Sequence, residues 1–140
     1  MTPSFLIDAG PLVALLNRRD RHHQWAKAVV AELSAPAYTC EAVLSEACFL
    51  LRSFPGGSDA VMALVEADLV KPVFRLADEA ASVRRLMARY ANVPMSLADA
   101  CLVRLSELHP GVPVLTLDKD FRIYRRSRRR VVPTVTPPER

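Results

Sequence analysis

Short apolar runs alternate with helical patterns along this chain, and this alternation limits the possible folds more than any other feature. The runs 5–7 and 114–117 are almost entirely apolar instead of alternating with polar residues. Such runs are typical of strands that are covered on both faces. Strands of this kind, connected by helices, form a mainly parallel sheet between two helical layers. The sequence therefore predicts an α/β fold, a three-layer α/β/α sandwich.

Hydrophobic periodicity and turn residues predict the positions of the individual elements. We expect helices at 11–17, 20–33, 41–52, 58–69, 78–90 and 96–108. We expect strands at 4–8, 37–40, 70–76, 112–117 and 131–132, and a helical turn at 121–126. Pro72 assigns its strand to an edge of the sheet, because proline cannot donate to a neighbouring strand.

Four acidic residues lie where the chain should be buried. Asp8 and Asp118 end apolar runs, Asp99 opens a predicted helix, and Glu46 lies within another. In a parallel sheet, ligands bind beyond the carboxyl ends of the strands, which is where Asp8 and Asp118 fall. Several buried like charges are costly unless a cation neutralises them. Carboxylate oxygens without nearby cysteine or histidine spacing favour Mg²⁺ or Mn²⁺, and hence phosphate-ester chemistry.

Three of these acids also have a structural alternative. Asp8 could cap the helix that begins near residue 11, and Asp99 fits the last position of a capping box in 96–99. Asp118 could cap the turn that follows it, with Asp120 interacting with the dipole of that turn. A capping role and a role in a shared site are compatible.

Glu46 is predicted on the core side of its helix, together with Val43 and Ala47. The structural alternative is an ion pair with Arg52 or with a neighbouring element. Glu41 is the competing acid, but its place in the first turn is explained by the helix dipole. We therefore prefer Glu46 as the candidate site residue.

The net charge of +4 is concentrated in one segment near the C-terminus. Without its six arginines, acidic residues outnumber basic ones in the rest of the chain. A local cluster of arginines favours a polyanion such as a nucleic-acid backbone, although a solvated tail is the plain alternative. The cluster at about 122–130 comprises Arg122, Arg125, Arg126, Arg128, Arg129 and Arg130.

The remaining composition predicts one ordinary domain, 1–140, with ample core. Cys40, Cys48 and Cys101 lack paired spacing and are interpreted as small core residues in a reducing cytosol. The N-terminal apolar run is too short for a signal peptide, and no run is long enough to span a membrane. These features predict a cytoplasmic protein.

Four segments, in this order and spacing, resemble the motifs of PIN-domain ribonucleases, the fold of VapC-type toxins. The similarity runs from Phe5 to about Tyr124. The matching segments are Leu6-Ile7-Asp8-Ala9-Gly10-Pro11-Leu12-Val13-Ala14-Leu15-Leu16, Leu44-Ser45-Glu46-Ala47, Leu97-Ala98-Asp99-Ala100 and Val114-Leu115-Thr116-Leu117-Asp118-Lys119-Asp120-Phe121.

The resemblance implies a metal-dependent endoribonuclease that hydrolyses RNA, acting as the toxin of a toxin–antitoxin pair. It implies that Asp8, Glu46, Asp99 and Asp118 are both the catalytic residues and the ligands of Mg²⁺ or Mn²⁺, with Asp120 as an additional ligand. It further implies a homodimer and a cognate antitoxin that blocks the site. The arginine cluster would hold RNA phosphates without reading the sequence.

One departure from the family pattern and one further shared segment concern other positions. Many relatives have Ser or Thr two residues after the first Asp, where this chain has Gly10, so any contact of that hydroxyl is lost. The segment 20–23, Asp-Arg-His-His, recurs in similar proteins. Adjacent histidines on a helix point in different directions, so His22 and His23 are predicted to have surface or packing roles.

Two other functions fit parts of the pattern. A PIN-like fold could bind RNA without cleaving it, although the intact acidic set argues against loss of activity. A phosphoacceptor receiver domain also places acids at strand ends. It would need adjacent acids after the first strand, where this chain has Asp8 followed by Ala9.

Overall fold

Five parallel strands form the central sheet of the computed structural model, which describes residues 3–127 and 129–138. Their order is β3-β2-β1-β4-β7, so the first strand of the chain lies in the middle. Every neighbouring pair is parallel, and Leu6 of β1 pairs with Tyr38 on one side and Val114 on the other. The strands are β1 (Leu6–Ile7), β2 (Ala37–Thr39), β3 (Val70–Pro72), β4 (Val114–Leu115) and β7 (Thr134–Val135).

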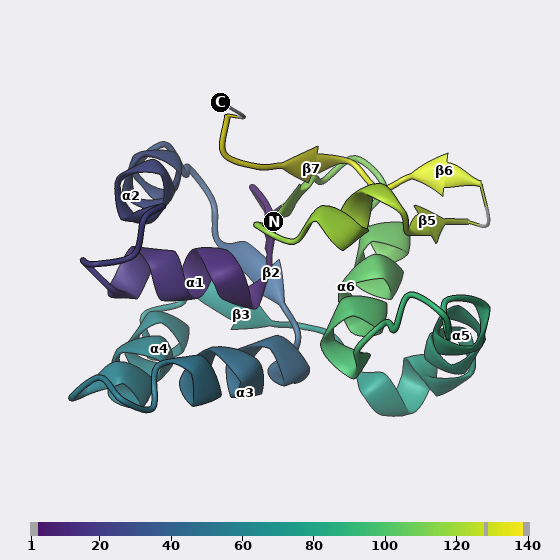
Figure 1. Cartoon of the computed structure of the whole chain (residues 1–140), viewed down its shortest axis with the longest axis horizontal. Helices are drawn as coiled ribbons and strands as arrows, with labels where there is room; N and C mark the ends of the chain where they lie inside the picture. Colours follow the sequence, from purple (N-terminus) through teal and green to yellow (C-terminus); the bar gives the residue numbers. More distant parts are fainter. Residues whose placement is uncertain (1–2, 128, 139–140) are drawn as a thin grey trace.

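Helices lie on both sides of this sheet (Figure 1). Four of them, α1 to α4, gather on one side, and α5 and α6 pack together on the other. The predicted three-layer α/β/α arrangement is therefore confirmed. The helices are α1 (Ala9–Leu16), α2 (His23–Ala31), α3 (Glu41–Leu50), α4 (Gly57–Glu66), α5 (Leu76–Arg89) and α6 (Leu97–Leu108).

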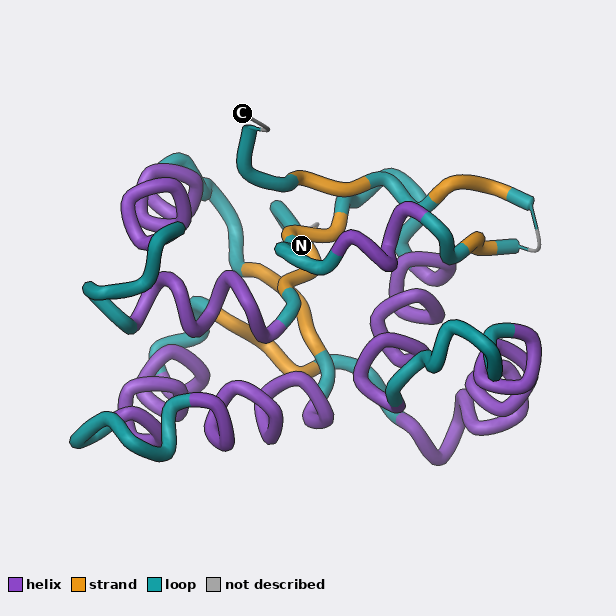
Figure 2. The backbone as a smooth tube through the Cα atoms, in the orientation of Figure 1, coloured by secondary structure: helices purple, strands orange, loops and turns teal. Residues whose placement is uncertain are grey.

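The strands are short and lie between the helical layers, as Figure 2 shows. Leu6, Ile7, Val114 and Leu115 are each at most 1% exposed. Burial on both faces explains why these runs are apolar rather than alternating. The strand with Pro72 lies at one edge of the sheet, as predicted.

The C-terminal part differs most from the prediction. The expected turn at 121–126 is wrong in its second half: a 3₁₀ helix, η1 (Lys119–Arg122), is followed by strand β5 (Arg125–Arg126). β5 pairs antiparallel with β6 (Arg130–Val131) in a separate two-stranded sheet. Ser127 has a φ of 48° and helps to reverse the chain between them. The sheet's outer strand β7 was not predicted, because two residues between prolines give no periodic signal.

The start of α2 also differs from the prediction. Asp20 does not cap this helix directly, because α2 begins at His23. Its Oδ1 accepts a hydrogen bond from the His22 N–H at 2.8 Å, and its carbonyl accepts one from the His23 N–H. Asp20 therefore holds a turn that leads into the helix.

The three cysteines are free, and Cys40 and Cys101 are buried, which confirms their interpretation as core residues. Among the helices of the described residues, none is both long and apolar enough to cross a membrane.

Candidate active site

Asp8 lies directly after β1 and is the N-cap of α1, which begins two residues earlier than predicted. Its Oδ1 accepts a hydrogen bond of 2.8 Å from the N–H of Ala9. The side chain is only 6% exposed. The pKa of Asp8 is raised to about 6, mainly by burial and also by the nearby carboxylates of Asp99 and Glu46, against the hydrogen bonds from Thr116 and Ala9 that lower it.

Thr116 connects Asp8 to the chain that follows β4. Its hydroxyl donates to Oδ2 of Asp8 at 2.7 Å and accepts from the N–H of Asp118 at 2.9 Å. Thr116 is completely buried, and sequence analysis did not single it out. The available signal was a hydroxyl at the end of an apolar strand, two residues before an acid.

Asp118 caps η1, because its Oδ1 accepts from the N–H of Asp120 at 2.9 Å. Burial raises the pKa of Asp118, and the charges of Asp99 and Asp120 raise it as well. Asp118 therefore caps η1, as predicted, and also lies near other acidic side chains.

Asp99 completes the predicted capping box with Ser96 at the start of α6. Its Oδ2 also accepts a hydrogen bond of 2.9 Å from the hydroxyl of Tyr124, which follows η1. Tyr124 is fully buried against Phe121 and Tyr90, with ring centroids 5.3 Å away in both cases. Burial and the hydrogen bond to Asp99 raise the pKa of the Tyr124 hydroxyl, so it stays a donor. Tyr124 is a second site residue that the sequence did not reveal.

Glu46 corrects one expectation, because its side chain is exposed and does not face the core. Val43 and Ala47 are buried on the same helix, so Glu46 lies at the border of the buried face. Partial desolvation raises the pKa of Glu46, and the charges of Asp99 and Asp118 add to the effect. The residue therefore lies near Asp99 and Asp118.

The effects of neighbouring charges on the pKa values indicate that the four predicted acids lie in one region, formed by β1, α3, α6 and the segment after β4. Asp99 raises the pKa of each of the other three, and Glu46 also acts on Asp8. Asp120 acts on Asp118 and on Tyr124.

Among residues 3–127 and 129–138, no group of three or more His, Cys, Asp and Glu side chains is close enough to hold a metal ion as it stands. The donor set nevertheless fits a hard cation, because it consists of carboxylate oxygens. Burial and neighbouring acidic charges raise the pKa values of Asp8, Glu46 and Asp118. A raised carboxylate pKa means that no nearby positive charge stabilises the ionised form. A divalent cation would supply that positive charge.

Gly10 is explained by packing. A β-carbon at this position would lie 3.2 Å from Cβ and Cδ1 of Leu117, tighter than most real contacts. Gly10 has no hydroxyl, but the hydroxyl of Thr116 donates a hydrogen bond to Asp8 in this site.

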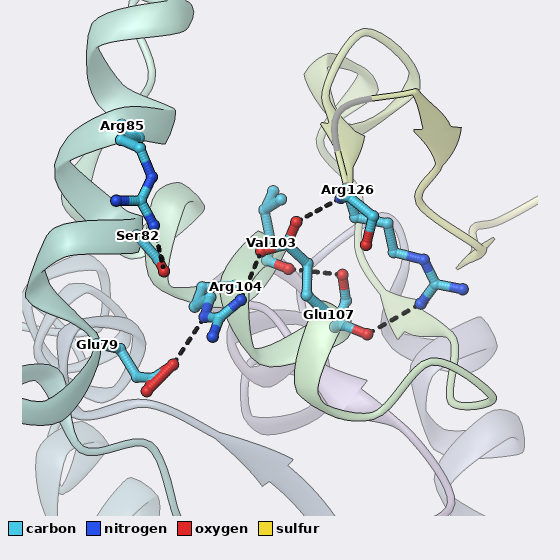
Figure 3. Close-up of polar contacts among 9 residues, drawn as sticks. Glu79, Ser82, Arg85, Val103, Arg104, Glu107 and Arg126 are labelled. Atoms are coloured by element: carbon cyan, nitrogen blue, oxygen red, sulfur yellow. Dashed lines mark hydrogen bonds and ion pairs between the residues drawn. The ribbon is translucent and has the colours of Figure 1, made fainter.

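The arginine cluster divides into different environments. Arg126, labelled in Figure 3, is 8% exposed. Its guanidinium donates to the carbonyls of Ser106 at 2.9 Å and Pro110 at 2.6 Å. Arg125 donates from Nη1 to three carbonyls of the preceding residues. Arg129 and Arg130 are exposed.

A buried guanidinium bonded to carbonyls holds the hairpin β5–β6 against the end of α6. This guanidinium is not available to phosphate, so we no longer count Arg126 among the candidate RNA-binding residues. Arg122 is exposed on η1, and Arg128 lies outside the described residues.

His22 and His23 have separate roles. Nδ1 of His23 lies 2.8 Å from the carbonyl oxygen of Ala14, which can only accept, so this nitrogen donates and ties α2 to α1. His22 packs edge-on against Trp25, with ring centroids 6.4 Å apart. No shared ligand is needed to explain the pair.

Comparison with known proteins identifies the family to which this chain belongs. The PIN domain model matches residues 5–127, and the chain belongs to this family. Among solved structures, the chain is similar to VapC20 of Mycobacterium tuberculosis, a toxin that cleaves the sarcin-ricin loop. The two share 24% identity with a TM-score of 0.73, over 84% of this chain and 92% of that one. At this identity the similarity establishes a common fold. No curated protein matches the chain.

Proposed function

We propose that this PIN-domain chain is a metal-dependent endoribonuclease and the toxin of a toxin–antitoxin pair. The observation that carries the proposal is the proximity of four acids near the carboxyl edge of the sheet: the charge of Asp99 contributes to the raised pKa values of Asp8, Glu46 and Asp118. VapC20, which has this fold, is an RNA-cleaving toxin, and this supports the same class of substrate here.

The four carboxylates would hold Mg²⁺ or Mn²⁺, with Asp120 as an additional ligand. When bound, such an ion lowers the pKa of a water molecule and neutralises charge on the reacting phosphate. Thr116 fixes one oxygen of Asp8, and Tyr124 fixes one oxygen of Asp99. These hydrogen bonds orient the ligands before a cation arrives.

RNA phosphates would contact the exposed arginines of the cluster, Arg122, Arg129 and Arg130, without reading sequence. We further propose a single nuclease domain over 1–140, a cytoplasmic homodimer, and inhibition by a cognate antitoxin. Family membership removes the receiver domain as an alternative. A non-catalytic RNA-binding module is disfavoured, because the acidic set expected for catalysis is intact in the sequence.

The test is cleavage of mixed RNA with Mg²⁺ or Mn²⁺, compared with EDTA. We expect cleavage by the wild type only with metal, and none by Asp99→Asn. Asp59→Asn is the matched control, because Asp59 lies in the first turn of α4 as Asp99 does in α6, but is exposed and outside the site. RNA binding without cleavage by the wild type would support the non-catalytic module instead.

A further inference from the structure

A groove of about 960 Å³ lies beside the candidate active site. One wall is formed by the start of α2 and the turn before it, with Arg21, His22 and Trp25. The lining also includes η1 with its cap Asp118, and residues of the segment 134–138. Since Asp118 belongs both to the groove and to the acidic site, a molecule in the groove reaches the candidate catalytic residues.

The charged residues of this groove favour a polyanion. Its described lining includes three cations, Arg21, Lys119 and Arg122, against the single carboxylate of Asp118. Arg21 and Lys119 are exposed, so their charged groups are accessible to phosphates. The volume is in the range of sites that hold organic ligands.

An aromatic ring lies on the same wall. Trp25 is half-buried, and its ring is supported by the edge of His22. Aromatic side chains next to cations are the usual platform for unpaired bases, because every base can stack on a ring while its phosphate contacts a cation. A base within a duplex is already stacked and does not expose its face.

The segment 20–23 builds this wall. Asp20 fixes the turn through the N–H groups of His22 and His23, and His23 anchors the helix to the Ala14 carbonyl. Arg21 and His22 are thereby left to line the groove. This motif, which the acidic site does not use, acquires a function on this basis.

We propose that the groove holds an unpaired nucleotide of the RNA substrate next to the cleaved phosphate, with its base stacked on Trp25 and its phosphates at Arg21 and Lys119. The inference rests on the proposed ribonuclease function and adds a substrate-binding site to it. Trp25 is a positioning group for the substrate and takes no part in the chemistry.

The test uses the full chain in EDTA, so that RNA binds without being cleaved. Trp25 is the only tryptophan, so its fluorescence reports directly on the groove. We expect a short unstructured oligoribonucleotide to quench this fluorescence, and an RNA duplex to quench it far less. Trp25→Ala should weaken binding of the single strand, followed by fluorescence anisotropy of a labelled RNA, by about tenfold. Trp25→Phe should retain most of the affinity.

A second variant does not depend on the half-buried tryptophan. Arg21→Gln with Lys119→Gln should lower affinity and reduce the slope of log affinity against log salt by about 2. Lys27→Gln is the matched control, because Lys27 is exposed on α2 but does not line the groove. Thermal melting confirms that each variant is folded.

Unchanged RNA affinity in folded Trp25→Ala and in the double variant would overturn the inference. Loss of binding to a partner protein with unchanged RNA affinity would overturn it too, and would assign the groove to that protein. If either of these results is found and the wild type still cleaves RNA, the proposed ribonuclease function is retained, but the groove is not its substrate-binding site. If the wild type neither binds nor cleaves RNA, the proposed function fails and the groove proposal fails with it.

Discussion

The hydroxyl of Thr116 donates a 2.7 Å hydrogen bond to Asp8, although the two residues are 108 positions apart in sequence. The same hydroxyl accepts from the backbone N–H of Asp118. One buried oxygen therefore fixes the acid after β1 relative to the acid after β4. Since β1 and β4 are neighbours in the sheet, this contact defines the spacing of two candidate metal ligands.

Replacing Thr116 with valine keeps the shape but removes both hydrogen bonds. We expect metal-dependent cleavage to fall about 10–100-fold, the usual cost of losing a group that orients a ligand. The free energy of unfolding should fall by about 1–3 kcal/mol, because a buried N–H loses its acceptor. RNA cleavage and urea unfolding measure the two effects. Thr116→Ser should restore both, and a valine variant as active as the wild type would show that the hydroxyl does not position Asp8.

The raised pKa of Asp8 predicts how the free energy of unfolding depends on pH when no metal is bound. Its pKa is raised from 3.8 to about 6 in the folded protein. Well below pH 3.8 the residue is protonated in both the folded and the unfolded state, and its stabilising contribution is complete. As the pH rises from 4 to beyond 6, the unfolded chain loses the proton first, and about 3 kcal/mol of stability is lost.

The control for this pH effect is Asp8→Asn, which cannot titrate. In EDTA, the unfolding free energy of the wild type should fall relative to that of Asp8→Asn as the pH rises from 4 to 7. Addition of Mg²⁺ at pH 7 should recover stability in the wild type only. A difference that is constant with pH would contradict the raised pKa.

Asp118→Asn tests the neighbouring acid. The asparagine Oδ1 can still accept from the N–H of Asp120, so the cap of η1 is retained. Removing a charge near Asp99 relieves repulsion, and we expect the melting temperature in EDTA to be equal or higher. The increase in melting temperature on adding Mn²⁺ should be lost, together with cleavage. Full Mn²⁺ stabilisation of the variant would remove Asp118 from the ligand set.

The parts of the fold that the sequence predicted are those with a local cause. Continuous apolar runs at 5–7 and 114–117 predicted a parallel sheet, because burial on both faces leaves no place for polar residues. The capping roles of Asp99 and Asp118 followed from sequence spacing alone. Strand β7 was missed, because its two residues have no pattern of their own and pair only once β4 is in place.

The parts of the site that were missed depend on contacts between distant segments. Nothing near Thr116 or Tyr124 in sequence shows that their hydroxyls reach Asp8 and Asp99. The exposure of Glu46 also could not be read from periodicity, since residues at the border of a buried face share the spacing of core residues. Likewise, a run of arginines shows local charge but does not tell which guanidinium the fold buries.

The two kinds of arginine in the cluster should respond differently to the same substitution. Arg126→Gln leaves at least one of the carbonyls of Ser106 and Pro110 without its donor, so the free energy of unfolding should fall by about 2–3 kcal/mol. Arg129→Gln with Arg130→Gln should leave stability nearly unchanged, because both side chains are exposed. The double variant should instead bind RNA more weakly and reduce the salt slope by about 2. Urea unfolding and RNA titration at several salt concentrations separate the two effects. Unchanged affinity and slope in the double variant would show that the exposed arginines do not contact RNA, and oligomeric state would then be measured by light scattering.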